Sequence, residues 1–228
     1  MRRSVALLVA LGACGFQSPE AKTPPYCTDP NAVACYEFEG DTSDSSTNHL
    51  DATIVANVSF QPGMVGQAMQ FGPTSVVLVP YNPAFDVIAL TIEAWISPSQ
   101  LPSGVQHAGI LTTNGGYGFF LYPGGDLLCK GGIFLPMATA HVTIDRWTHV
   151  ACTYDNAGGA IYADGVRLMK VTGSATLQTG SPDGISLAAD NPPGTSSQLI
   201  GLIDEVRLMN VALTPEQICA DAGKSSCP

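Results

Sequence analysis

The sequence predicts an all-β fold in which two antiparallel sheets form a sandwich or jelly roll, followed by one short helix. The chain has 24 Gly and 17 Pro among its 228 residues. Together with many small and β-branched residues, these favour short strands joined by tight turns. Short apolar segments separated by turn residues also recur at the intervals typical of such a sandwich.

Two local patterns support individual strands. The segment LTIEAWI (90–96) alternates with a period of two, which is typical of a strand with one buried face. The dipeptide Asp164-Gly165 predicts a hairpin, because Gly accepts the positive φ of a tight turn. This hairpin lies within residues 161–168, and the other expected strands cover residues 76–79, 147–154 and 196–208.

The expected helix begins after Thr214, which is a suitable N-cap. Pro215 follows at the first helical position, and Gln217 completes a capping box. The helix should be short and end near Gly223.

Aromatic and histidine residues of the strands are expected to serve the structure. Trp95, Trp147 and Phe71 should fill the core between the sheets, because aromatic side chains contribute much of core burial. His149 has no second His at metal-ligand spacing, so we expect a buried strand histidine and not a ligand or base.

Charge and length narrow the class of protein. Lys and Arg total 9 against 19 Asp and Glu, a formal net charge of −10. This balance argues against nucleic acid as a partner, since phosphate binding needs a basic patch. No apolar run after residue 14 approaches the roughly 20 residues needed to span a bilayer. About 200 residues are enough for one sandwich with a sizeable core. We therefore expect a single domain over residues 33–228, with a C-terminal helix and a cysteine-containing tail.

The N-terminus is typical of an export signal. Two Arg precede a short apolar stretch and the sequence Leu-Gly-Ala-Cys, which predicts a signal peptide over residues 1–13. The segment resembles the bacterial lipobox, which implies a lipidated Cys14 and a membrane anchor that does not span the bilayer. Residues 14–32 would then form a flexible tether of roughly 20–25 Å. The residue after Cys14 is Gly15 and not Asp, a pattern that resembles Gram-negative lipoproteins sorted to the outer membrane. The alternative is an ordinary signal peptide with a chance cysteine.

The cysteine count fits an exported protein. Six cysteines remain after Cys14, an even number that predicts disulfides, and none has the CxxC spacing of a zinc site. Cys129 and Cys152 lie in strand-like segments, and we expect them to pair across neighbouring strands. The other four cysteines cluster at the two ends of the domain and would staple the termini, with three pairings left open: Cys27, Cys35, Cys219 and Cys227.

Six motifs in order resemble the LamG-like jelly roll of the concanavalin A-like lectin/glucanase superfamily, over roughly residues 34–220. The resemblance implies two antiparallel sheets of about a dozen strands, with the first and last strands adjacent. The motifs are YEFEGD with DSS (36–46), PGMVGQAMQF (62–71), LTIEAWI (90–96), RWTHV (146–150), YADG (162–165) and GLIDEVRL with ALTPEQI (201–218).

The resemblance also implies a structural calcium ion, held by Asp44 and Asp204 where the first and last strands meet. The loop over residues 41–48 is rich in the oxygen ligands that Ca²⁺ prefers. In the alternative, Asp44 caps a turn and Asp204 faces solvent.

Enzymatic activity is not expected. The glucanases of this superfamily carry a Glu-x-Asp-x-x-Glu strand, and the two catalytic carboxylates lie about 5 Å apart. The most similar segment here, Glu37-Phe-Glu39-Gly-Asp41, differs in spacing and in residue type, although an extended strand would place its three acids on one face.

The leading hypothesis is a non-enzymatic, lipid-anchored protein of the bacterial cell envelope, in the outer membrane, whose domain binds carbohydrate or a glycosylated surface. Asn114, Tyr117 and Tyr122 are the candidate ligand residues, because an amide can bind sugar hydroxyls and a Tyr ring can stack on a pyranose. In the alternative, they form a hairpin edge, and the domain is a protein-interaction, adhesion or envelope scaffold module without glycan binding. Such a fold hosts both functions.

Overall fold

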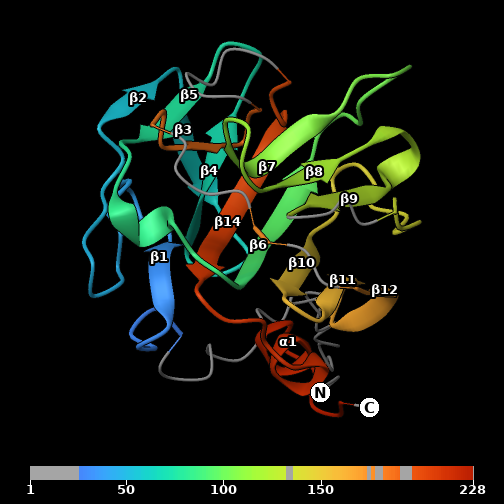
Figure 1. The fold of residues 1–228 in the computed structure, drawn as a ribbon. Coiled ribbons are helices and arrows are strands. Elements are labelled where there is room, and N and C mark those ends of the chain that lie inside the picture. Colours follow the sequence, from blue (N-terminus) through green and yellow to red (C-terminus); the bar gives the residue numbers. More distant parts are fainter. Residues whose placement is uncertain (1–25, 132–135, 174–175, 178–181, 191–196, 228) are drawn as a thin grey trace, which may run out of the picture.

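A computed structural model describes residues 26–131, 136–173, 176–177, 182–190 and 197–227. It consists of two antiparallel sheets packed face to face and one short helix at the lower end of the sandwich (Figure 1). The larger sheet, sheet A, has the strand order β12 (Val166–Thr172), β11 (Gly158–Ala163), β10 (Thr148–Asp155), β6 (Leu90–Pro98), β14 (Gly201–Met209), β4 (Gln67–Phe71) and β3 (Ser59–Pro62), with β1 (Ala32–Tyr36) also paired to β14.

The smaller sheet, sheet B, covers one face of sheet A. Its strand order is β2 (Ile54–Ala56), β5 (Val76–Val79), β13 (Ile185–Leu187), β7 (Ala108–Thr113), β8 (Gly118–Leu121) and β9 (Leu127–Lys130). Two 3₁₀ turns, η1 (Pro83–Phe85) and η2 (Pro123–Gly125), lie in the connections, and α1 (Pro215–Asp221) follows the last strand. The predicted all-β jelly roll with a C-terminal helix is confirmed.

Strand β14 organises sheet A. One edge of β14 pairs with β6, while the other edge pairs with β4 over Gly201–Ile203 and with β1 from Val206 onward. The first and last strands are therefore adjacent, as the resemblance implied. With nine residues, β14 is about 27 Å long and connects the two ends of the sandwich.

The alternation predicted in β6 decides which residues form the core. Ile92 and its alternate neighbours belong to the buried cluster between the sheets, and so does Phe71. Trp95 is 8% exposed but lies on the other face of β6, outside that cluster, while Trp147 is only half-buried. The expectation that both Trp side chains fill the core is wrong. Trp95 is buried on the outer face of β6, which is covered as well, and Trp147 lies just before β10 and outside the core cluster.

The predicted turns form as their residues require. Asp164 and Gly165 have φ values of 48° and 77°, so both central residues of the β11–β12 turn are left-handed. The Thr214 side chain accepts a hydrogen bond from the Gln217 amide, and the Gln217 side chain accepts one from the Thr214 amide. The capping box of α1 is confirmed.

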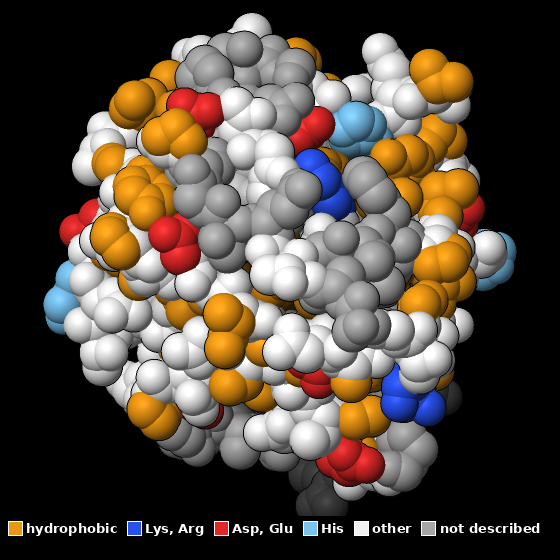
Figure 2. Space-filling model, viewed as in Figure 1, with side chains coloured by type: hydrophobic (Ala, Val, Ile, Leu, Met, Phe, Trp, Pro, Cys, Tyr) orange, Lys and Arg blue, Asp and Glu red, His pale blue; other side chains and the backbone are white. Residues whose placement is uncertain are grey.

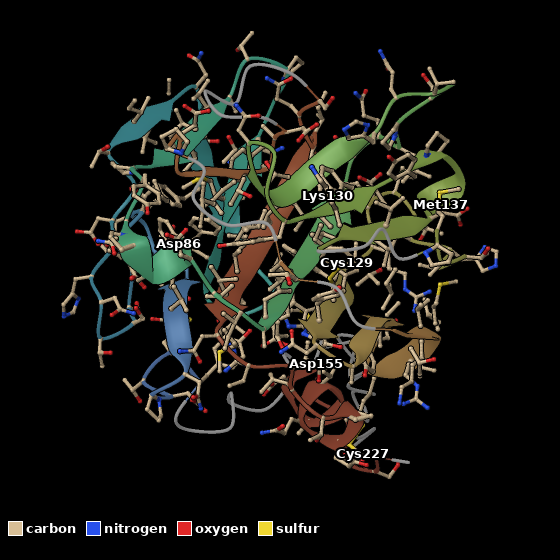
Figure 3. The ribbon with its side chains drawn as sticks, in the orientation of Figure 1. Asp86, Cys129, Lys130, Met137, Asp155 and Cys227 are labelled. Carbon is tan, nitrogen blue, oxygen red and sulfur yellow. A yellow bond between two sulfur atoms is a disulfide. The ribbon has the colours of Figure 1, made fainter. Side chains whose placement is uncertain are left out.

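Three disulfides cross-link the described chain. Cys129 bonds to Cys152 as predicted, but the two strands are not neighbours in one sheet: β9 is the edge of sheet B and β10 lies inside sheet A. This disulfide therefore joins the two sheets, and Figure 3 places Cys129 where β9 passes over β10. The other two join the remaining cysteines within each end, as Cys27–Cys35 and Cys219–Cys227, so neither links the N-terminal to the C-terminal end.

The N-terminal predictions fall mostly outside the described residues. The signal peptide, Cys14 and the tether up to residue 25 are not described, whereas Tyr26 and Cys27 are buried. The tether predicted to extend to residue 32 is therefore wrong over its last residues, because these pack against sheet A. Within the described ranges, none of the helices is long and apolar enough to cross a membrane.

Candidate functional site

A groove of about 330 Å³, the rim groove, opens where β6 ends and β14 begins. Three connections line it: Pro73 from the β4–β5 turn, residues 100–107 from the β6–β7 connection, and residues 197–200 before β14. In Figure 1 these connections lie at the upper end of the sandwich, away from α1.

Two glycines allow neighbouring backbone segments to pack closely at this end of the sandwich. Gly201 has a φ of 144°, and a Cβ there would overlap the Ser97 carbonyl of β6. A Cβ on Gly109 would overlap the Ala189 carbonyl, and the Gly109 amide donates to the Ser197 carbonyl at 3.0 Å. Larger residues at these positions would push one wall of the rim groove away from the sheets.

The side chains that line the rim groove are mostly neutral and polar. Amides and hydroxyls supply hydrogen-bond donors and acceptors, while Leu101 and Ile200 add apolar surface. Among the described residues, the lining includes no Lys, Arg, Asp or Glu. The polar lining residues are Gln100, Ser103, Gln106, His107, Ser197 and Gln198.

His107 is held in place by three neighbours. Its Nε2 lies 2.9 Å from Oδ2 of Asp190, its ring stacks on Tyr122 at 5.3 Å, and the edge of Phe120 meets it at 5.2 Å. The imidazole is therefore presented to the rim groove in a fixed orientation.

Tyr122 reaches the rim groove only through this stacking contact. Its side chain is half-buried, and burial, followed by the charge of Asp190, raises the pKa of its phenol above the ordinary value of 10. Tyr122 is therefore a neutral hydroxyl donor at physiological pH.

The structure separates the three residues predicted to bind a ligand. Tyr117 is 1% exposed and donates its hydroxyl hydrogen to the Phe85 carbonyl, so its predicted stacking on a sugar is wrong. Asn114 is exposed and donates to Oδ2 of Asp183 at 2.6 Å, but it lies at the end of β7 opposite His107. Of the three, Tyr122 alone lies near the rim groove.

Sequence reasoning overlooked the residues that line the rim groove. The β6–β7 connection contains Gln100, Ser103 and Gln106 among turn residues, a polar pattern that could have indicated a binding loop. Ser197 and Gln198 come from a segment about ninety positions later. Nothing local in the sequence indicates that the two segments meet.

Asp44 does not fit the role of a calcium ligand in this arrangement. Its Oδ1 accepts hydrogen bonds from the amides of Cys35 and Ser46, and its Oδ2 accepts from the Ser46 hydroxyl and the Leu50 amide, each at 2.8 Å. These four bonds use the acceptor capacity of a carboxylate. Asp44 therefore organises its own loop, as the alternative interpretation expected.

Asp204 is fully buried and contacts a different turn. Its Oδ2 accepts a hydrogen bond from the Val65 amide at 2.9 Å, and a Cβ on Gly63 would come within 2.6 Å of the same oxygen. The expectation that Asp204 faces solvent is wrong. In the described part of the chain, no three His, Cys, Asp or Glu side chains gather closely enough to hold a metal ion. The calcium ion stays a prediction.

The acidic segment that most resembles a glucanase strand is not extended. Strand β1 ends at Tyr36, and Phe38 has a φ of 57°, so the chain turns before Glu39. Glu39 accepts a hydrogen bond from the Gln67 amide, and Asp41 accepts one from the Ser43 amide. The three acids are therefore not aligned on one strand face.

A second polar cluster lies buried on the outer face of sheet A. Arg207 of β14 donates to Oε1 of Glu93 from Nε at 2.6 Å and also from Nη2, and Nη2 donates to Oδ2 of Asp221 in α1 at 2.6 Å. Nε2 of His149 lies 3.5 Å from the other Glu93 oxygen. Burial raises the pKa of Glu93, but Arg207 and His149 lower it more, to below 4.5. Glu93 is thus ionised and paired.

His149 belongs to this cluster and confirms the expectation of a buried strand histidine. It is fully buried, and its ring meets the edge of Trp95 at 5.2 Å. Tyr26 closes the cluster from outside, because its ring lies over the Arg207 guanidinium. None of these charged residues lines the rim groove or the groove formed by β10, β11 and β12. The cluster serves stability.

The comparison with protein families decides the assignment. The model of the concanavalin A-like lectin/glucanases superfamily matches residues 71–219, more than half of the chain. The chain belongs to this superfamily. The match extends from the end of β4 to α1 and so includes the rim groove. No curated protein sequence matches the chain significantly.

Solved structures of the superfamily fold resemble the chain over most of its length. Domain 4 of AbnA, a GH43 extracellular arabinanase from Geobacillus stearothermophilus, solved with arabinotriose, has a TM-score of 0.69 and 23% identity over 84% of this chain and 98% of that domain. The binding domain of botulinum neurotoxin DC, solved with SialylT, has a TM-score of 0.62 and 13% identity over 86% of this chain and 52% of that chain.

A sialidase of Trypanosoma rangeli also contains the fold. Its TM-score is 0.62 at 16% identity, over 86% of this chain and 34% of the sialidase. This chain therefore spans about half of the toxin chain and about a third of the sialidase. At these identities the likeness shows the fold, which is shared by enzymes and by binding domains.

Proposed function

We propose that the chain is a non-enzymatic carbohydrate-binding domain that holds a short stretch of neutral glycan in its rim groove. The observation that carries this proposal is the lining: three amides, two hydroxyls and an oriented imidazole surround about 330 Å³. Sugar hydroxyls both donate and accept hydrogen bonds, and amide side chains can satisfy both roles. The volume of the rim groove lies near the lower end of the range that is usual for small-ligand sites, which is about 300–1,000 Å³.

The same lining supports binding without hydrolysis. Glycoside hydrolysis usually requires two carboxyl groups on opposite sides of the scissile bond, about 5–9.5 Å apart. The described residues that line the rim groove include no carboxylate, and Asp190 beside it is engaged with His107. The arabinotriose complex of AbnA domain 4 is consistent with sugar binding on this fold.

The test is glycan-array screening, followed by calorimetric titration of any neutral oligosaccharide that binds. Gln106→Ala combined with Gln198→Ala should weaken binding by about tenfold or more, because each substitution removes polar contacts in the rim groove. Gln61→Ala is the matched control, since Gln61 is exposed on β3 and does not line the rim groove.

Equal affinity of the double variant and the wild type would place the sugar elsewhere and contradict the proposed site. Specific capture of an envelope protein, without any glycan binding, would instead support the protein-interaction alternative.

We also propose that the chain is lipid-anchored at Cys14 in the bacterial cell envelope, in the outer membrane. The chain enters the described part at Tyr26, which contacts Glu205 and Arg207 on β14. This is the half of β14 farther from the rim groove, so an anchor on that side would leave the rim groove facing outward. Incorporation of labelled palmitate that Cys14→Ser abolishes would support the anchor, and labelling of the Ser variant would contradict it.

A further inference from the structure

A second groove, the hairpin groove, lies on the outer face of sheet A and has a volume of about 250 Å³. The β10–β11 hairpin, the edge strand β12 and the segment leading into α1 form its walls. Figure 3 shows Asp155 of this groove at the lower end of β10, close to α1. The hairpin groove is thus separated from the rim groove by the length of the sandwich.

A β-bulge places two cations in the hairpin groove. Arg167 pairs with Tyr162, and Lys170 pairs with Ala160. The two cations are therefore three positions apart along β12, whereas their partners are only two positions apart along β11. In a regular strand, residues three apart point to opposite faces. Because the bulge adds one residue to β12, the side chains of Arg167 and Lys170 lie on the same face. Bulges commonly redirect side chains in this way near functional sites.

Neither cation forms an ion pair with a described residue. Among the described residues, no carboxylate lies within 4.0 Å of the side-chain nitrogens of Arg167 or Lys170. Asp155 also lines the groove and contributes one negative charge, but it lies beyond ion-pair distance of both cations, and its Oδ1 accepts a hydrogen bond from the Ala157 amide. Glu216 attracts Arg167 only from beyond ion-pair distance.

This concentration of positive charge is unusual for the chain. Only 9 of its 228 residues are Lys or Arg, and the net charge is −10. On the face shown in Figure 2, blue side chains form only small patches, one of them at the lower right, where Figure 1 places β12. Two cations held on one face repel each other, and an anion between them would remove this repulsion.

We propose that the hairpin groove binds the carboxylate or sulfate group of an acidic saccharide. Arg167 would bind the anionic group through its planar fork of donors, and Lys170 would add a second charge. Tyr162 and Ala160, which are 2% and 5% exposed, form an apolar floor for the sugar ring. Thr153 and Thr172 supply hydroxyls at the walls.

The volume of the hairpin groove suits a single charged sugar unit, since it lies just below the usual range for a whole small ligand. The choice of a saccharide rests on the proposed function, whereas anion binding rests only on the charges and their placement. The two grooves are lined by different residues, so failure of one site does not imply failure of the other.

The test is calorimetric titration of the purified protein with trigalacturonate and with a heparin tetrasaccharide, compared with neutral galactotriose. At least one acidic oligosaccharide should bind, with an affinity that falls as NaCl is raised. Arg167→Gln combined with Lys170→Gln should weaken this binding by about tenfold or more. Gln106→Ala with Gln198→Ala should leave it unchanged, because those residues line the rim groove.

Arg146→Gln is the matched control for charge. Arg146 is exposed and lies 3.7 Å from Asp164, outside the hairpin groove, so this variant should bind as the wild type does. Binding that is absent, or equal in the double variant, would overturn the proposal. Binding only to vesicles that contain phosphatidylglycerol would also overturn it, and would instead identify an anionic lipid headgroup as the ligand.

Discussion

The guanidinium of Arg207 lies 3.8 Å from the centre of the Tyr26 ring and donates from Nη1 to the Tyr26 carbonyl at 2.8 Å. Through the same guanidinium, β14 is connected to Glu93 of β6 and to Asp221 of α1. The segment before β1 and helix α1, which lie at opposite ends of the sequence, are therefore both joined to sheet A through one buried cation.

Arg207→Met is expected to destabilise the fold by about 3–5 kcal/mol. The substitution keeps an apolar stem but leaves the Glu93 carboxylate buried without its main partner, which is more costly than the loss of the pair itself. Urea unfolding followed by fluorescence measures the change. Arg146→Gln removes a largely exposed cation and should change stability by less than about 0.5 kcal/mol. Similar stabilities for the two variants would show that the buried cluster contributes little.

Stability should depend on pH through Asp221. Burial and then the charge of Glu93 raise its pKa to about 6, against the opposing effects of Arg207 and His149. The folded state therefore binds this proton more tightly than the unfolded chain, whose value is near 3.8. The free energy of unfolding should fall by about 3 kcal/mol as pH rises from about 4 to about 6.

Asp221→Asn should remove this decrease, as measured by urea unfolding across the same pH range. At lower pH the sign is reversed, because Glu93 has a lowered pKa and its protonation destabilises the fold as pH falls through that value. A decrease between pH 4 and 6 that persists in Asp221→Asn would assign it to another group.

Asp44→Ala should lower stability by about 2–4 kcal/mol whether calcium is present or chelated. The expected loss follows from the four hydrogen bonds that the carboxylate accepts within its loop. Thermal melts with calcium and with chelator measure it, and Asp41→Ala is the control, since Asp41 is exposed and accepts one bond from Ser43. If calcium raises the melting temperature of the wild type but not of Asp44→Ala, the predicted calcium site is supported instead.

Gly109→Ala should impair both stability and glycan binding. A Cβ there would overlap the Ala189 carbonyl and displace the segment that forms a wall of the rim groove, at a cost of about 1–3 kcal/mol. Gly72→Ala is the control, because its Cβ would meet only the Ser75 hydroxyl at 3.9 Å. Unchanged melting and binding in Gly109→Ala would show that this wall moves freely.

The fold could be predicted from the sequence because its main signals are local. The alternation in residues 90–96, the Asp164-Gly165 turn and the capping box at Thr214 each act within a few positions, and the strand, the turn and the helix all form. The single buried face expected of residues 90–96 is wrong, because β6 is buried on both faces. Asp204 differs, since its burial depends on the turn containing Val65, which lies 139 positions away.

The site could not be predicted in the same way. Asn114 and Tyr122 are eight positions apart in the sequence, but β7 and β8 form a hairpin and carry them to opposite ends. Tyr117 belongs to the same polar and aromatic stretch, yet its side chain points into the core, where the Phe85 carbonyl satisfies its hydroxyl. The rim groove is formed by three connections that lie far apart in the sequence, around Pro73, residues 100–107 and residues 197–200.

Each disulfide of the described chain joins cysteines that follow one another directly in the sequence: Cys27 with Cys35, Cys129 with Cys152, and Cys219 with Cys227. If the chain is exported and Cys14 is lipidated, as proposed, an oxidant that links cysteines in the order in which they emerge would therefore produce the native set directly. The Cys27–Cys35 bond can close before any later cysteine has emerged. Maturation of this domain should accordingly require an oxidase but no disulfide isomerase.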